Sequence, residues 1–158
     1  MRTIQTFTLI AALLAGGCAV VQPEVLEQPV GPQSIAPEAQ TDHGSLVVYS
    51  NIVREYGDPG YLVRTGYRLL TAKGELVQKV DDRSSASDER PQPLNLPIGQ
   101  YTVVAEAAND RPVTLSAVIR AGRTTVIDLN QEVFPRGTDA RGNWVHLSTG
   151  QIVGPKAD

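Results

Sequence analysis

Hydrophobic and polar residues alternate along three stretches in the second half of the chain. The clearest stretch, Gln100–Ala107, places tyrosine, valine and alanine on one side and mainly polar residues on the other. The same alternation recurs over Val113–Arg120 and Thr125–Leu129. Because successive side chains of a strand point to opposite faces, each stretch predicts a half-buried β-strand. The short turns Asn109-Asp110 and Ala121-Gly122 join them, which predicts an antiparallel meander.

The alternation also predicts the orientation of individual side chains, because a shift of one residue would exchange the two faces of a strand completely. The expected inward residues are Tyr101, Val103, Leu115, Ile119, Thr125, Ile127 and Leu129. The expected outward residues are Thr102, Thr114, Ser116 and Asp128.

Weaker signals upstream predict further strands. Residues 46–49 form a continuous apolar run, as expected of a strand covered on both faces, and residues 66–71 and 75–80 flank the turn Ala72-Lys73-Gly74. Residues 94–96 alternate after Pro91 and Pro93, which favours an edge position because proline cannot donate to a ladder. Residues 44–130 are thus predicted to form a seven-stranded antiparallel β-sandwich.

The segment LNLPIGQYTV at Leu94–Val103 resembles the LP-x-G-x-Y-x-V signature of prealbumin-like sandwiches, namely the carboxypeptidase regulatory-like, PEGA-like and collagen-adhesin B-type domains. The segments Val118–Leu129 and Tyr67–Val77 resemble the closing hairpin and the glycine-turn hairpin of these domains. The resemblance implies that the leucine ends one strand, that Pro-x-Gly forms a corner and that the tyrosine opens the next strand. It also implies an accessory module that binds, spaces or stabilises, with no catalytic residue.

Residues 1–17 have the order of a secretory signal: Arg2, then an apolar run over residues 7–15, then small residues. The run is shorter than the ~20 residues that span a bilayer. Leu14-Ala15-Gly16-Gly17-Cys18 resembles the lipobox of bacterial lipoproteins, although Ala15 stands where the family prefers leucine. The resemblance implies cleavage before Cys18 and a lipid on its thiol. The alternative is an ordinary signal peptide with an incidental cysteine.

The regions on either side of the sandwich have different compositions. Residues 18–43 are rich in proline, glutamine and acids, and we expect a disordered, flexible tether without a core. A short helix packed on the domain is the alternative, which the close spacing of the prolines opposes. Residues 131–158 are predicted to be a C-terminal extension with a hairpin, in which Trp144 covers an open end of the sandwich.

The residues with chemical potential are few. The single cysteine excludes an internal disulfide, and the net charge of −3 does not favour a nucleic-acid partner. His43 and His146 stand in no catalytic motif, and the acids within residues 81–89 lack the spacing of a calcium loop, so we expect no metal and no cofactor. Tyr56 and Tyr61 flank the turn Asp58-Pro59-Gly60. With Trp144 they form a candidate ligand-binding set, or they cover the edge of the sandwich.

Three functions are compatible with these patterns. The first is a non-catalytic, membrane-anchored envelope lipoprotein that acts as a structural or protein-interaction module. The second is a carbohydrate- or peptidoglycan-binding module. The third is a hydrolase, which requires a buried His146 beside a hydroxyl or carboxylate. Because Ala19 stands where many inner-membrane lipoproteins carry aspartate, the outer membrane facing the periplasm is favoured for a Gram-negative host.

Overall fold

The described residues form twelve β-strands and no helix, so the all-β prediction is confirmed. The computed structural model describes residues 21–32, 41–54, 62–81, 90–108, 110–134 and 142–157. The strands are β1 (Glu24–Val30), β2 (His43–Tyr49), β3 (Ile52–Arg54), β4 (Leu62–Arg64), β5 (Tyr67–Thr71), β6 (Leu76–Val80), β7 (Leu94–Pro97), β8 (Gly99–Ala107), β9 (Arg111–Ile119), β10 (Thr124–Asp128), β11 (Trp144–His146) and β12 (Ile152–Pro155).

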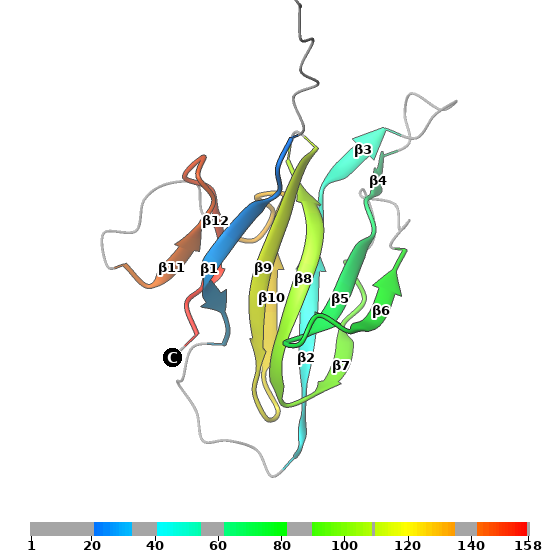
Figure 1. Cartoon of the computed structure of the whole chain (residues 1–158), viewed down its shortest axis with the longest axis vertical. Coiled ribbons are helices and arrows are strands. Elements are labelled where there is room, and N and C mark those ends of the chain that lie inside the picture. Colours follow the sequence, from blue (N-terminus) through cyan, green and yellow to red (C-terminus); the bar gives the residue numbers. More distant parts are fainter. Residues whose placement is uncertain are drawn as a thin grey trace, which may run out of the picture.

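Two sheets face each other across one hydrophobic core, which gives the fold a sandwich-like character. The larger sheet has the order β1-β9-β8-β5-β6 and the smaller sheet the order β10-β2-β7. In Figure 1, β10 and β2 lie behind β9 and β8. Alternate residues of both sheets enter the core, and every residue predicted to point inward is buried: Tyr101, Val103, Leu115, Ile119, Thr125, Ile127 and Leu129. Thr102, Thr114 and Ser116 are half-buried on the opposite face.

The chain passes between the two sheets at a corner that follows β7. Strand β7 ends at Pro97 and β8 starts at Gly99, and the two strands belong to different sheets. The Tyr101 hydroxyl donates a hydrogen bond of 3.0 Å to the Pro97 carbonyl, so the first inward residue of β8 holds the corner in place. Pro97 and Gly99 flank the corner, but both belong to strands, and Tyr101 is the third residue of β8 rather than its first.

The predicted meander is wrong at its third strand. Strands β8 and β9 pair antiparallel over their full length, but β10 crosses to the smaller sheet and pairs with β2 in parallel. The turn between β9 and β10 is bound to β2, because the Gly122 amide donates a hydrogen bond to the His43 carbonyl at 2.8 Å. Gly44 permits this contact, since a Cβ at that position would lie 2.2 Å from the Arg120 carbonyl oxygen.

Other details of the predicted sandwich also change. Between residues 44 and 130 the described residues form nine strands rather than seven, including the separate three-residue pair β3–β4. Strand β2 buries only alternate side chains and is not covered on both faces. The hairpin around Gly74, which has a φ of 84°, and the edge position of β7 agree with prediction.

Strand β1 lies within the segment that was predicted to be a disordered tether, so that prediction is wrong for residues 24–30. Strand β1 pairs in parallel with β9, and Val30 is fully buried in the core. Figure 1 shows β1 alongside β9. The register of this pair shifts between Leu26 and Val30, the stretch that contains Pro29, and the Pro29 carbonyl accepts a 2.9 Å hydrogen bond from the Ala157 amide.

The predicted C-terminal hairpin is present and closes one side of the sandwich. Strands β11 and β12 pair antiparallel, and the residues after β12 bond to the end of β1. Gly154 allows β12 to approach both sheets, because a Cβ there would lie 2.5 Å from Val30 Cγ1 and 2.8 Å from the Val126 carbonyl oxygen. The first and last strands of the described chain are therefore packed and hydrogen-bonded against each other.

Removal of β1 is expected to destabilise the domain. A fragment of residues 41–158 lacks Val30, whose burial alone contributes about 1.5–3 kcal/mol, and it exposes the edge of β9. Its free energy of unfolding in urea should therefore be lower than that of residues 21–158 by at least that amount. A fragment starting at Glu24 is the control and should retain full stability. Equal urea midpoints for all three fragments would contradict the structural role of β1.

Candidate functional site

The sequence-predicted site residues are not assembled into one site by the described residues. Cys18, Tyr56 and Tyr61 lie outside them. Trp144 is half-buried on β11, and its ring packs on that of Phe134 with centroids 5.2 Å apart and planes tilted by 59°. The tryptophan therefore takes part in packing between the C-terminal hairpin and the residues after β10.

A groove on the outer face of the smaller sheet is the candidate site. It has a volume of about 470 Å³, and Val47, Tyr49 and Val126 form its floor. These side chains are half-buried and alternate along β2 and β10 with fully buried residues of the core. Pro91, Pro93 and Val133 also line the groove. Rigid strands thus present apolar and aromatic side chains outward.

The Tyr49 end of the groove lies against a cation. The Arg64 guanidinium carbon lies 5.3 Å from the centroid of the Tyr49 ring, a cation–π distance. The Arg64 side chain is only 2% exposed, so its charge needs a partner within the protein. Glu132 provides it through two hydrogen bonds of 2.6 and 2.7 Å to the two terminal guanidinium nitrogens.

The Glu132 carboxylate is held in its charged form. Partial burial acts to raise its pKa, but hydrogen bonds from Arg64 and Asn130, with the charge of Arg64, outweigh this effect. The pKa of Glu132 therefore lies below its ordinary value. The pair is a bidentate arginine–carboxylate contact, which fixes geometry as well as charge.

Asp128 organises the loop that carries Glu132. Its carboxylate accepts four backbone hydrogen bonds: from the amides of Asn130 and Glu132 at 3.1 Å, Val133 at 2.7 Å and Phe134 at 3.1 Å. Asp128 is fully buried, so its predicted outward position does not expose it to water. Its neighbours Ile127 and Leu129 enter the core as the alternation predicts, and the amides of the following loop solvate the Asp128 charge in place of water.

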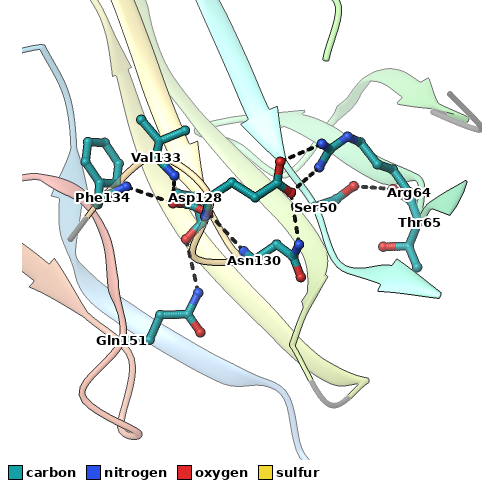
Figure 2. Close-up of polar contacts among 9 residues, drawn as sticks. Ser50, Arg64, Thr65, Asp128, Asn130, Val133, Phe134 and Gln151 are labelled. Atoms are coloured by element: carbon teal, nitrogen blue, oxygen red, sulfur yellow. Dashed lines mark hydrogen bonds and ion pairs between the residues drawn. The ribbon is translucent and has the colours of Figure 1, made fainter. Parts of the chain in front are cut away.

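Further hydrogen bonds connect this loop with its neighbours, and Figure 2 shows the network. The Gln151 side-chain amide donates to the Asp128 carbonyl at 3.3 Å, which attaches the C-terminal hairpin. The Ser50 hydroxyl donates to the Thr65 carbonyl at 2.6 Å, which attaches β4 to the end of β2. The network therefore joins four separate parts of the chain: the end of β2, the end of β4, the loop after β10 and the C-terminal hairpin.

Sequence reasoning missed Asp128, Glu132 and Arg64. A local signal exists for Asp128, because an aspartate at the end of a strand with a polar residue two positions later is typical of an Asx turn. Arg64 and Glu132 are 68 residues apart, so no local pattern joins them.

The two histidines are placed at the surface. His146 Nδ1 lies 3.3 Å from the Gly150 carbonyl oxygen, a backbone partner within its own hairpin. His43 Nδ1 lies 2.6 Å from Asp42 Oδ1. The hydrogen bond with His43, then a backbone hydrogen bond within Asp42 and the charge of His43, hold the pKa of Asp42 below its ordinary value.

Within the described ranges, no group of three histidine, cysteine or acidic side chains is placed to hold a metal ion. No helix in the same ranges has the length and apolar character needed to cross a membrane. Comparisons with protein-family models, with curated proteins and with solved structures found no match to this chain.

Asp128→Asn is expected to destabilise the domain strongly. The amide nitrogen of asparagine would face two backbone N–H donors, so buried donors would lose their acceptor, at about 2–4 kcal/mol in total. Chemical denaturation measures the change. Glu106→Gln, at an exposed carboxylate on β8, is the matched control and should stay within about 0.5 kcal/mol of the native protein. Similar small effects for both variants would contradict the solvation of Asp128 by the loop.

Glu132→Gln is expected to have an effect that depends on pH. At neutral pH it should lower the free energy of unfolding by about 1–3 kcal/mol, because the buried Arg64 loses its counter-charge. The partial exposure of Glu132 to solvent limits the size of this effect. A carboxyl with a depressed folded pKa stabilises above its unfolded pKa, and this stabilisation disappears as the pH falls through the folded pKa. The difference from the native protein should therefore shrink below pH 4.5. A difference in urea midpoint that persists throughout the acid range would contradict this assignment.

Proposed function

We propose that the chain is a lipid-anchored lipoprotein of the bacterial cell envelope whose β domain is a non-catalytic module for protein interaction. The lipobox-like sequence before Cys18 supports the anchor, with the membrane contact made through lipid on that residue. The groove on β2 and β10 carries the interaction role, because it gathers outward apolar side chains on rigid strands. For a Gram-negative host, the location is the outer membrane facing the periplasm.

The corner between the sheets supports a relationship with the prealbumin-like sandwiches. The Tyr101 hydroxyl bonds the Pro97 carbonyl, in the manner of a tyrosine that stabilises a sandwich corner. The parallel pairings of β1 with β9 and of β10 with β2 modify that plan. The relationship is thus proposed for the corner and the β8–β9 hairpin, with additions at both ends of the chain.

The ligand proposed for the groove is an extended protein segment with aliphatic or aromatic side chains. Val47, Val126 and Val133 offer apolar surface, and burial of such surface yields about 25 cal/mol per Å². Arg90 also lines the groove and provides a positive charge for an acidic residue of the segment. A sugar would stack on an aromatic face, but Arg64 covers one face of the Tyr49 ring and the Trp144 ring packs on Phe134.

Site-specific photocrosslinking in living cells tests this proposal. A photoreactive amino acid at Val133, which is 46% exposed on the groove, should yield a discrete adduct with one envelope protein. The same amino acid at Lys73, on the exposed β5–β6 turn, is the control and should yield none. In the Cys18→Ser background the protein should leave the membrane fraction, and mass spectrometry of the native protein should find a diacylated Cys18.

The outcomes are distinct. An adduct that disappears on digestion of peptidoglycan would overturn the protein partner in favour of a cell-wall ligand. Equal products at both positions, or none at either, would overturn the role of the groove. An unmodified mature N-terminus at Ala19 or later would overturn the lipid anchor.

A further inference from the structure

Strand β1 begins very close in sequence to the cysteine that is proposed to carry the lipid. Six residue steps separate Cys18 from Glu24. A chain extends by at most about 3.6 Å per residue, so the two Cα atoms lie within roughly 22 Å of each other. The reach of the lipid is therefore set by these few residues and not by a segment extending to His43.

Glu24 is fixed to the body of the domain. Its carboxylate accepts hydrogen bonds from the Ser148 amide, from the Ser148 hydroxyl at 3.1 Å and from Arg111 at 3.2 Å. Its side chain is only 15% exposed. The pairing of β1 with β9 begins at this same residue, because Glu24 is in register with Val113. The start of β1 is thus held by contacts from two other parts of the chain.

One end of the sandwich is defined by these contacts. Strand β9 starts at Arg111, directly after the turn from β8, and the 148–150 turn bonds to Glu24. Strand β9 has nine residues, so its far end lies about 26 Å away at roughly 3.3 Å per residue. The start of β2 lies at that far end, where the His43 carbonyl accepts from the Gly122 amide.

We propose that this end of the domain, formed by Glu24, Arg111 and the 148–150 turn, faces the lipid bilayer at short range. The proposal rests on the lipid at Cys18 proposed above. The short connection and the fixed Glu24 leave the domain little freedom to turn over. A flexible tether running to His43 would place the opposite end nearer the lipid. The bilayer-facing surface therefore follows from β1 and was not visible as a charge pattern in the sequence.

The orientation also places the groove. The Leu129 amide donates to the Tyr49 carbonyl at 2.8 Å, and the Ala108 amide donates to the Leu129 carbonyl at 3.1 Å. Ala108 follows the end of β8, where Ala107 pairs with Arg111. The Tyr49 end of the groove thus belongs to the bilayer-facing end of the sandwich. A partner bound in the groove must approach the membrane surface closely.

Energy transfer from the protein to labelled lipid tests the orientation. The full lipidated chain is bound to phospholipid vesicles with acceptor dyes on the headgroups, and a donor is placed at Thr149→Cys or Lys73→Cys, both on exposed turns. The sulfur of a lipidated Cys18 is a thioether and does not react with the dye. Transfer should be higher from position 149 than from position 73, because Lys73 lies at the far end, beyond the pairing of Thr71 with Tyr101.

A lengthened connection is the matched variant. Twenty glycine and serine residues inserted between Gln22 and Pro23 add roughly 25 Å as a flexible coil and leave β1 intact. The difference in transfer between the two positions should then be lost. Equal transfer at the native spacing, or higher transfer from position 73, would overturn the orientation. Failure of the chain to bind vesicles at all would instead overturn the lipid anchor.

Discussion

The buried carboxylate of Asp128 imposes the constraint on which one end of this domain depends. A charge removed from water requires donors, and the backbone of residues 130–134 supplies four of them. The loop that supplies these donors therefore has one conformation. Glu132 then reaches Arg64, Val133 lines the groove and Phe134 packs on Trp144. Two contacts with distant parts of the chain and one side of the groove follow from the solvation of one side chain.

The first and last strands of the described chain are also held by contacts with each other. Strand β1 is placed by β9 and by the residues after β12, while β12 fits between β1 and β10 only because residue 154 is glycine. Gln151 connects this C-terminal hairpin to the Asp128 carbonyl. The hairpin therefore depends on the loop after β10, and the position of β1 depends on the hairpin. The ends of the chain stabilise the domain as a set rather than as separate appendages.

The limits of sequence-based prediction follow from the range of the interactions. The faces of β8 and β9 and the hairpin at Gly74 depend on neighbouring residues, and the alternation predicted them correctly. Strand β10 crosses sheets because Gly44, distant in sequence, admits its turn. Strand β1 was missed because proline interrupts its few apolar residues. The Glu24 carboxylate that holds it bonds to residues 87 and 124 positions away in the sequence. The burial of Asp128 was not predicted because a charge at an outward position is normally exposed, whereas local amides replace water here.

The small size of the groove and the short connection to the proposed lipid both affect how tightly the domain could hold the proposed protein partner. The groove is lined by eight residues, far fewer than the roughly 20–30 residues a side of a stable protein interface. A weak contact is sufficient when both proteins are held at one membrane surface, because confinement raises their effective concentration. In the proposed lipid-anchored arrangement β1 provides this condition, since Glu24 lies within a few residues of Cys18 and the Tyr49 end of the groove lies at the same end of the sandwich. A long free tether would dilute that advantage, and the structure opposes it by incorporating residues 24–30 into the sheet.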